Sequence, residues 1–385
     1  MRIAFFTDVF FPLVSGVTTV TADLAKGLAD KGHKVYIICP KINNSKEFKY
    51  KNIKVVRLKG IPALIYPDFK LTSPFSYKIF DLIKKERIDI IHFQITMPLG
   101  IQAIFLSKLL GIPLVGTFHT FFADPDYLKH ANLDYKFVEN ASWWYARQYY
   151  NRCDLITCPT ISVKKEMIKH RFNKNIKIIS NGIDLKNFKR GNGKLIKKRY
   201  RLDDKVILFF GRIAYEKNIK YLLECFKLVL KDKPNVKLMI VGGGPQLSKF
   251  KDNTKELGIE KNVVFTGMVN YKELPSYIMA CDLFATASTT ETFGLTTIES
   301  QAMGLPSVCV NARGSKDVVK DGFNGYLIKP GDKKGFADRI IKLLSKDNLR
   351  IKMGKNAVKE SKKYNNKRIV NIWEKEYKKL LKSNS

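Results

Sequence analysis

The chain has 385 residues, 45% of them hydrophobic, and a formal net charge of +34 at pH 7. Its length suits two domains, and its apolar content suffices for two cores. No apolar run approaches the ~20 residues that span a bilayer, and the N-terminus carries an acid at Asp8 and a proline at Pro12 instead of a cleavage site. We therefore expect neither a membrane-spanning nor a secreted protein, but a cytoplasmic one.

The net positive charge and the cysteines give further information on the class of protein. A basic surface attracts nucleic acid, anionic lipid or acidic ligands, but lysine on solvated faces can equally follow from a biased genome composition. The basic residues are spread over both halves of the chain, and no nucleic-acid-binding motif accompanies them. The six cysteines form no CxxC pair and stand mostly in apolar runs, which is typical of buried, reduced thiols.

The first half of the chain alternates short apolar runs with longer amphipathic stretches. The runs are rich in β-branched residues and nearly continuous, as expected of strands that are buried on both faces. Helical patterns stand between them, for example at 17–31, 98–110 and 135–151. This alternation predicts a parallel doubly wound sheet. The predicted strands are residues 2–6, 34–39, 53–58, 89–93, 113–118, 154–158 and 176–180.

A polar, basic stretch at 186–205 has the character of a linker, and the alternation restarts after it. We therefore predict an α/β protein of two Rossmann-like doubly wound domains, at 1–185 and 186–363. Because ligands bind beyond the carboxyl ends of parallel strands, the two domains are expected to face an interdomain cleft. The predicted strands of the second domain are residues 206–211, 236–244, 263–267, 282–288, 306–310 and 325–329.

The last stretch of the chain is helical and rich in lysine. From about 364 to 385, apolar residues such as Ile369, Trp373 and Tyr377 recur at the spacing of one helix face. We expect this helix to pack back on the first domain. A helix that lies on a membrane is the alternative.

Two strand ends of the second domain carry residues suited to a phosphate ligand. Gly211 ends a predicted strand, and Arg212 and Lys217 follow in the loop. Arginine supplies a fork of donors and lysine a point charge, so the pair suits a departing diphosphate, with ordinary surface cations as the alternative. Gly243, in the sequence VGGGP at 241–245, serves either a tight turn or a close approach to a ligand.

The strongest cluster is STTETFGLTTIESQAMGLP at 288–306, which follows a strand and opens a helix near Leu295. Backbone N–H groups of Phe293 and Gly294 would face outward at the helix N-terminus, where anionic or hydroxyl oxygens bind. Glu291 and Glu299 flank that position, and carboxylates bind vicinal hydroxyls. The alternative is that Glu299 only complements the helix dipole.

Two residues of the first domain complete the set of candidates. Gly16 stands just before the first helix and lets a phosphate approach the helix N-terminus closely. His119 lies just past a buried strand, where we expect it to face the cleft, although a lone histidine is more often structural.

Taken together, these residues resemble the retaining glycosyltransferases of family 4, which have the GT-B fold. The resemblance rests on Gly16, His119, SNGID at 180–184, Gly211-Arg212 with Glu216-Lys217, GGGP, and the pair Glu291 and Glu299. Each motif is weak alone, but their order and spacing over essentially the whole chain are specific. One departure is SGV at 15–17, where many members carry two glycines.

The resemblance implies a nucleotide diphosphate sugar as donor, transfer with retention, and no metal or other cofactor. Front-face attack would then be assisted by a donor phosphate oxygen, with positioned charge supplying most of the catalysis. It implies catalytic roles for His119, Arg212, Lys217 and Glu291. It implies donor binding by Gly16, Gly211, Gly243, Phe293, Gly294, Leu295 and Glu299, with Glu299 on the ribose.

For the acceptor, TFHTFFADPDYLKH at 117–130 and WWYARQYY at 143–150 resemble bacterial 1,2-diacylglycerol 3-glucosyltransferases, which act at the membrane surface. A basic stretch at 41–59 precedes an apolar one at 61–69, a combination that suits an anionic interface. We expect glucose transfer from UDP-glucose to diacylglycerol by a protein peripheral to the inner face of the plasma membrane.

Other functions stay open at this point. The acceptor could be phosphatidylinositol, a polysaccharide or a soluble molecule, and the donor a GDP-sugar. A nucleotide-sugar epimerase of the same fold and a nucleic-acid-binding protein are more remote alternatives. Asp124-Pro125-Asp126 imitates the DxD metal motif of another glycosyltransferase fold, and we interpret it as part of an acceptor-side loop.

Overall fold

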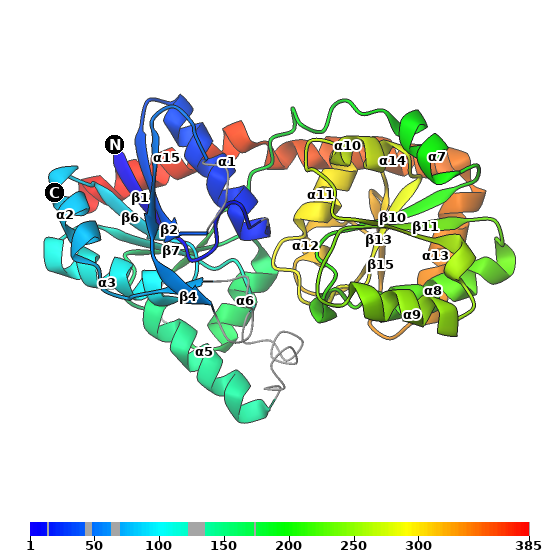
Figure 1. The fold of residues 1–385 in the computed structure, drawn as a ribbon, viewed down its shortest axis with the longest axis horizontal. Helices are drawn as coiled ribbons and strands as arrows, with labels where there is room; N and C mark the ends of the chain where they lie inside the picture. The colour runs from blue at the N-terminus through cyan, green and yellow to red at the C-terminus, as the bar shows by residue number, and fades with distance from the viewer. Residues whose placement is uncertain (14, 43–47, 63–69, 122–134, 173–174, 385) are drawn as a thin grey trace. The chain divides into compact units, whose positions relative to one another are not determined.

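The computed structural model describes residues 1–385 apart from residues 14, 43–47, 63–69, 122–134, 173–174 and 385. The chain forms two compact units (Figure 1). Unit 1 comprises Met1–Ile183 and Asn366–Ser385, and unit 2 comprises Asp184–Asn365. Unit 2 is therefore inserted into the sequence of unit 1, and each unit is described by itself.

Unit 1 is built on a seven-stranded parallel sheet in the order β3-β2-β1-β6-β7-β8-β9. The direction of chain order reverses between β1 and β6, so ligands are expected beyond the carboxyl ends of these two strands. All seven strands predicted for this half are present, with ends within two residues of the prediction. They are β1 (Arg2–Phe6), β2 (Lys34–Pro40), β3 (Ile53–Leu58), β6 (Ile90–Phe93), β7 (Leu114–Thr117), β8 (Leu155–Cys158) and β9 (Ile176–Ile178). A short antiparallel pair, β4 (Gly60–Pro62) and β5 (Lys70–Thr72), was not predicted.

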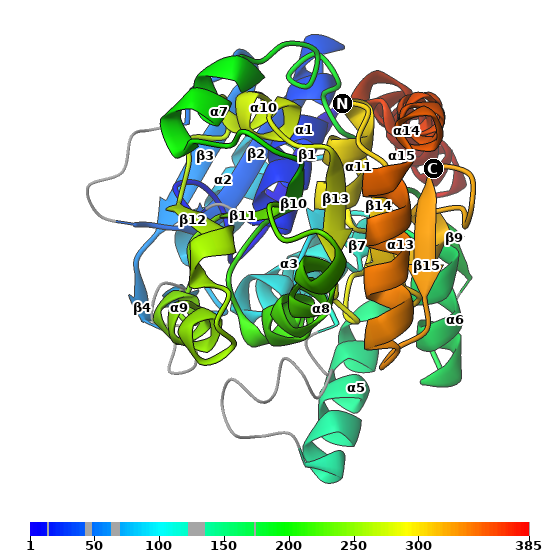
Figure 2. The same ribbon diagram turned by 90° about the vertical axis from the view of Figure 1, so that its right-hand side faces the viewer.

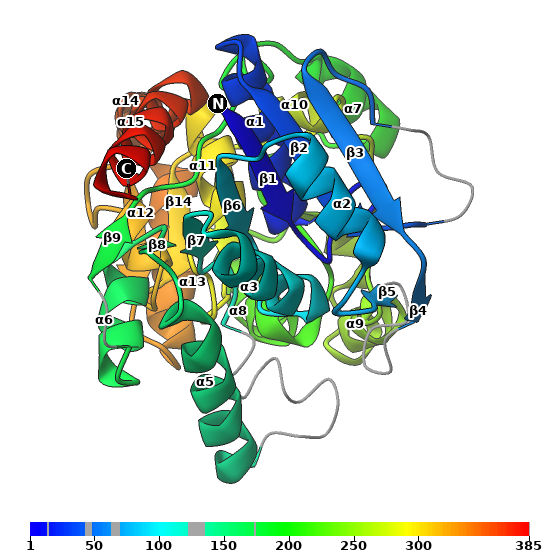
Figure 3. The same ribbon diagram turned by 90° about the vertical axis from the view of Figure 1, so that its left-hand side faces the viewer.

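Helices cover both faces of this sheet. The first core, with Ile83, Leu106 and Ala146, lies under α2, α3, α5 and α6, and the second, with Leu28 and Trp373, lies under α1 and α15. Figure 3 shows α2, α3 and α5 together on one side of the sheet, away from α1 and α15. The bounds are α1 (Gly16–Asp30), α2 (Tyr77–Lys85), α3 (Pro98–Leu110), α5 (Lys136–Tyr150), α6 (Ile161–Lys169) and α15 (Asn366–Asn384).

Unit 2 is built on a six-stranded parallel sheet in the order β12-β11-β10-β13-β14-β15. Chain order reverses between β10 and β13, as it does between β1 and β6 in unit 1. The strands are those predicted, with β11 and β13 shorter than their predicted runs because the final residues enter the site loops. They are β10 (Val206–Phe210), β11 (Lys237–Val241), β12 (Val263–Gly267), β13 (Leu283–Thr286), β14 (Ser307–Val310) and β15 (Gly325–Ile328).

The helices of unit 2 lie on both sides of its sheet (Figures 1 and 2). In both views α8, α9 and α13 lie on one side, and α7, α10, α11 and α14 on the other. The helices are α7 (Gly193–Tyr200), α8 (Ile219–Asp232), α9 (Leu247–Glu256), α10 (Leu274–Met279), α11 (Leu295–Ala302), α12 (Ser315–Val318), α13 (Lys333–Ser345) and α14 (Asp347–Ser361).

The interpretation of 186–205 as a linker was wrong for part of its length. Residues Gly193–Tyr200 form α7, whose N-terminus is capped by Asn192: its Oδ1 accepts the Leu195 N–H at 3.0 Å. A Cβ on Gly193 would lie 2.6 Å from the Met279 carbonyl oxygen, so the helix packs backbone to backbone on α10. The sequence did not predict this helix because five of its eight residues are polar or glycine.

The six cysteines are all buried and none forms a disulfide, as predicted. Burial raises the pKa of the Cys39 and Cys309 thiols to about 12, so neither forms a thiolate readily. Within the described part of the chain, none of the helices combines the length and the apolar character needed to cross a bilayer.

Candidate active site

The candidate residues of unit 2 gather where four neighbouring strands end, in the loops after β10, β11, β13 and β14. The first two loops touch through backbone atoms: the Ile213 N–H donates to the Gly243 carbonyl at 2.8 Å, and the Gly211 N–H to that of Val241 at 3.0 Å. A side chain on Gly242 would collide with the Gly211 carbonyl, and one on Gly244 with the Ile213 carbonyl. The glycine run is therefore required by packing, whatever Gly243 does for a ligand.

Lys217 and Glu291 form an ion pair that joins the loops after β10 and β13. The Lys217 Nζ donates to Glu291 Oε1 at 2.6 Å, with only 20% and 16% of the two side chains exposed. Burial opposes the lysine charge, but the carboxylates of Glu291 and Glu216 and the hydrogen bond outweigh it, so the pKa of Lys217 is raised. The sequence predicted both residues for the site but not their pairing.

The loops after β10 and β13 are also fixed by neutral hydrogen bonds. Lys217 ends a short 3-10 turn, Tyr215–Lys217, in which the Glu216 carbonyl accepts from Ser288 Oγ at 3.0 Å and from Thr290 Oγ1 at 3.3 Å. The loop after β14 joins them, because the Gly314 N–H donates to the Glu291 carbonyl at 2.8 Å. These hydrogen bonds fix the backbone from which the Glu291 and Lys217 side chains extend.

Helix α11 begins at Leu295, as predicted, and its N-cap is Gly294 with φ +84°. That backbone conformation favours glycine. The Phe293 side chain is buried and meets Tyr364 edge to face, with ring centroids 5.2 Å apart, so only its backbone can serve a ligand.

Glu299 is buried in α11 and accepts a hydrogen bond from the Tyr271 hydroxyl at 2.6 Å. It is the fifth residue of the helix and lies beyond its first turn, where the helix dipole has little effect on a carboxylate. Tyr271 was not predicted as a site residue, because it stands in a polar loop before α10 with no motif around it.

In unit 1, Gly16 is the first residue of α1 and is exposed. The side chain of the preceding Ser15 caps the helix by accepting the Thr18 N–H at 3.1 Å. The departure from two glycines in this loop therefore has a structural reason, since serine at this position supplies an N-cap.

His119 follows β7, is buried, and donates from Nε2 to Gln94 Oε1 at 2.8 Å. Burial lowers the pKa of His119 to about 4, so the imidazole is neutral at pH 7. Gln94 follows β6, the strand next to β7, and was not predicted as a site residue. Its position in HFQ at 92–94, directly after a predicted strand, is the feature of the sequence that could have indicated it.

Asp8 is a third residue that sequence reasoning missed as a site candidate. It follows β1, where chain order reverses, and its Oδ1 accepts the Leu99 N–H of α3 at 3.4 Å. Its Oδ2 is buried and has no hydrogen-bond partner among the described residues. Burial raises the pKa of Asp8 to about 7, although two backbone N–H groups oppose the shift.

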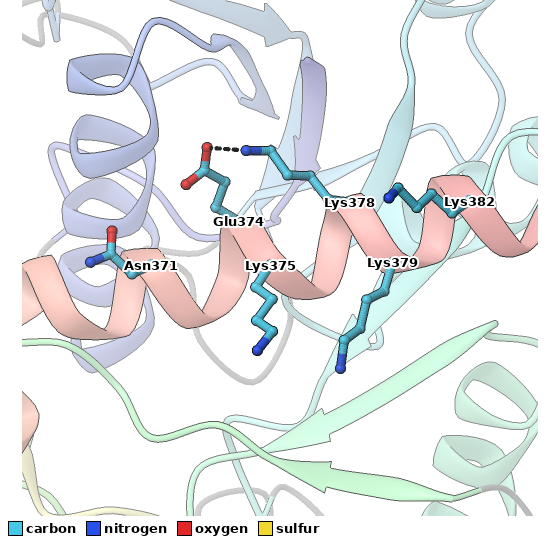
Figure 4. Close-up of a pocket in the computed structure, with 6 residues that line it drawn as sticks. All are labelled: Asn371, Glu374, Lys375, Lys378, Lys379 and Lys382. Atoms are coloured by element: carbon cyan, nitrogen blue, oxygen red, sulfur yellow. Dashed lines mark hydrogen bonds and ion pairs between the residues drawn. The ribbon is translucent and has the colours of Figure 1, made fainter.

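A hollow on unit 1 lies elsewhere and contains none of the predicted site residues. It lies along α15, where Glu374 accepts from the Lys378 ammonium at 2.9 Å (Figure 4). It is lined by Asn371, Glu374, Lys375, Lys378, Lys379 and Lys382. The Asp124-Pro125-Asp126 motif and most of 61–69 lie outside the described residues. Within the ranges that are described, no three histidine, cysteine or acidic side chains gather as metal ligands would.

Two parallel α/β units, each with polar side chains at the carboxyl edge of its sheet, define a glycosyltransferase of the GT-B class. Comparison with known proteins confirms this class. The family description Glycosyltransferase Family 4 matches residues 14–187, and Glycosyl transferases group 1 matches residues 194–360. The chain belongs to the family 4 glycosyltransferases, and the predicted enzyme class and fold are confirmed.

Relatives and solved structures agree with this assignment. An alpha-monoglucosyldiacylglycerol synthase of Streptococcus pneumoniae is 31% identical over 85% of this chain and 75% of its own. One from Acholeplasma laidlawii is 30% identical over 94% and 93%. Among solved structures, a sucrose-phosphate synthase of Thermosynechococcus elongatus has a TM-score of 0.80 at 18% identity, covering 99% of both chains. Anabaena HepE in complex with UDP-glucose has a TM-score of 0.78 at 21% identity, covering 100% of both.

Proposed function

We propose that this protein transfers glucose from UDP-glucose to diacylglycerol at a membrane surface, with retention of configuration. The observation that carries the transfer is the Lys217–Glu291 ion pair at the carboxyl edge of the unit 2 sheet. The choice of acceptor is supported by two relatives named alpha-monoglucosyldiacylglycerol synthase, at 30% and 31% identity. The choice of donor is supported by a structural neighbour solved with UDP-glucose.

In this proposal unit 2 binds the donor. Arg212 and Lys217 stabilise the diphosphate as it departs, and Glu291 binds hydroxyls of the sugar. The Lys217 ammonium already has a carboxylate partner at 2.6 Å, so its position is fixed before the donor binds. Electrostatic groups that are placed in advance need no reorganisation in the transition state. The backbone of Phe293, Gly294 and Leu295 adds N–H donors.

The remaining donor contacts are assigned to backbone and to one carboxylate. Glu299 binds the ribose hydroxyls, and the Tyr271 hydroxyl at 2.6 Å fixes the orientation of that carboxylate. Gly211 and Gly243 let the loops after β10 and β11 approach the nucleotide. No cofactor or metal is part of the proposal.

Unit 1 binds the acceptor, His119 contacts the transferred sugar, and Gly16 packs against the diphosphate. Because the pKa of His119 is lowered to about 4, the ring contacts sugar hydroxyls as a neutral imidazole. Its hydrogen bond to Gln94 holds the Nε2–H tautomer. The attacking hydroxyl loses its proton to a donor phosphate oxygen, which leaves with the nucleotide.

The test uses radiolabelled UDP-glucose and anionic vesicles, with and without diacylglycerol. We expect label in the lipid phase only when diacylglycerol is present. Binding of UDP-glucose without transfer would contradict the lipid acceptor and direct the search to soluble acceptors. One relative favours that second candidate: the N-acetyl-alpha-D-glucosaminyl L-malate synthase of Bacillus anthracis, 27% identical over 94% of both chains.

A further inference from the structure

Exposed aromatic side chains gather on one face of unit 1. Of the nine exposed aromatic side chains among the described residues, seven belong to unit 1, and all seven lie on α2, α3, α5 or the residues just before α2 and α5. These helices cover the same face of the sheet (Figure 3). We define the aromatic face as Phe75, Tyr77, Phe105, Leu109, Phe137 and Trp144.

Helix α3 is the centre of this face and has an unusual composition for a surface helix. Its sequence PLGIQAIFLSKLL carries a single charge, Lys108. Its two other polar side chains, Gln102 and Ser107, point inward and are buried. The solvent side therefore presents Phe105 and Leu109, with 46% and 55% of their surface exposed. A helix that is apolar on all sides normally has a partner on each side.

Two of the exposed side chains touch across helices. The Phe75 and Phe105 rings meet edge to face, with centroids 5.4 Å apart, and so join the start of α2 to α3. Tyr77 is 81% exposed, and Phe137 and Trp144 on α5 are 72% and 58% exposed. An exposed apolar surface of this kind marks a site of interaction.

The charge around the aromatic face identifies the partner. Helices α2, α3 and α5 carry six basic residues against two acidic ones, and one of these, Glu139, is paired with Lys136 at 2.8 Å. The aromatic and aliphatic anchors thus stand among lysines. This combination binds anionic lipid, with the rings at the headgroup level and the ammonium groups on the phosphates.

A second copy of the chain fits this surface less well. The cores of protein interfaces are depleted in lysine, but Lys108 lies on α3 between Phe105 and Leu109. The opposite face of the same sheet gives a contrast. The outer residues of α15, Lys375, Lys378, Lys379 and Lys382, are cationic, but no large exposed apolar side chain stands among the described residues of that helix.

We propose that the aromatic face is the surface by which this protein docks on an anionic lipid bilayer. The proposal rests on the proposed function, because an acceptor that resides in a bilayer requires the enzyme to reach the bilayer surface. Docking through α2, α3 and α5 would place this face of the acceptor-binding unit against the lipid, and not the opposite face of the same unit, where the α15 lysines lie.

The test compares the full-length protein with the triple variant Phe75→Ser, Tyr77→Ser, Phe105→Ser. A matched control removes three exposed apolar side chains of unit 2: Leu195→Ser, Met279→Ser, Ile351→Ser. Binding is measured by sedimentation with vesicles of phosphatidylcholine, alone and mixed with phosphatidylglycerol. We expect the wild type and the control to bind the mixed vesicles, and the triple variant to partition roughly tenfold more weakly. Circular dichroism and UDP-glucose binding check that the triple variant is folded.

Transfer to the water-soluble dibutyrylglycerol separates this proposal from the proposed function. The triple variant should retain that activity while losing transfer to vesicle-bound diacylglycerol. In a further outcome, the wild type glucosylates no diacylglycerol and yet binds vesicles more tightly than the triple variant does. That result would support docking through the aromatic face and contradict diacylglycerol as the acceptor. Equal vesicle binding by the triple variant and the wild type would overturn docking. So would a dimer of the wild type that the triple substitution dissociates, since the face would then bind a second copy.

Discussion

At the scale of single residues, the site depends on a few groups whose charge is fixed by their neighbours. Lys217 and Glu291 are nearly buried, and each is the nearest opposite charge of the other. Breaking such a pair by removing one partner is costly, because the other charge stays nearly buried without its hydrogen-bonded partner. The pair therefore contributes to stability and to transfer at once, and these two contributions can be separated.

We expect Lys217→Ala and Glu291→Ala each to lose roughly 10²–10³-fold in kcat and to lower the melting temperature. The double variant should recover part of the stability, because neither charge of the pair is then left without the other, but none of the transfer. Melting curves and transfer assays check this cycle. The control is Lys205→Ala, which breaks the ion pairs with Asp282 and Asp347. Lys205 and Asp282 directly precede β10 and β13, so they lie at the opposite ends of these strands from the site. Full activity of either single variant would show that the site has been assigned wrongly.

Asp8 gives a prediction about pH. Its pKa is raised from 3.8 to about 7 by burial, so the folded state holds a proton that the unfolded state has released. The stability this proton provides is complete below about pH 4 and declines as the pH rises to about 7, by on the order of a few kcal/mol. Asp8→Asn keeps a neutral side chain and should remove that decline.

Urea unfolding of wild type and Asp8→Asn at about pH 5 and about pH 8 measures the effect. The variant should be the more stable of the two at the higher pH, and the difference should shrink at the lower one. The same difference at both values would mean that the Asp8 carboxyl is ionised throughout this range.

At the scale of elements, α15 is joined to the sheet of unit 1 by a chain of buried hydrogen bonds. The Tyr377 hydroxyl lies 2.7 Å from His92 Nδ1, and His92 Nε2 lies 2.7 Å from Thr117 Oγ1. The pKa of His92 is well below its usual value because of burial and the neighbouring His119, so the ring is neutral. In the tautomer with the hydrogen on Nε2, the phenol donates to Nδ1 and Nε2–H donates to the threonine.

We expect Tyr377→Phe to destabilise the protein by about 1–3 kcal/mol, because Nδ1 of His92 is left buried without a donor. Urea unfolding measures the change. Tyr50→Phe is the matched control, since the Tyr50 hydroxyl bonds to Asp30 at 3.0 Å on an exposed surface and should cost far less. Equal losses in the two variants would contradict a structural role for the buried chain.

The elements also show which parts of the fold could be predicted from the sequence and which could not. The strands were predictable because those buried on both faces are continuous runs of β-branched residues. Helix α7 was missed because its stability comes from an N-cap and from glycine packing on α10, neither of which gives a periodic signal. In the site, spacing identified Lys217, Glu291 and Glu299. Tyr271, the partner of Glu299, and Gln94, the partner of His119, come from distant loops, so only the three-dimensional structure shows them.

At the scale of the whole molecule, unit 2 is continuous and unit 1 is not. Residues Ile369, Val370, Trp373 and Tyr377 complete the core that α1 covers, and they follow unit 2 in the sequence. The N-terminal amine meets His33 at 3.2 Å, and His33 meets Glu374 of α15 at 3.2 Å. Segments from near the beginning and end of the sequence thus share one core.

This insertion has a consequence for biosynthesis. When the ribosome has finished residues 1–183, the sheet of unit 1 still lacks the helix that covers half of one face, so apolar surface on β1 and α1 stays open to water. Unit 2 is synthesised next and contains all the strands and helices of its own sheet, so it can fold before α15 of unit 1 has been synthesised. The domain that is translated first is therefore the one that matures last, and chaperones have that whole interval in which to bind its open face.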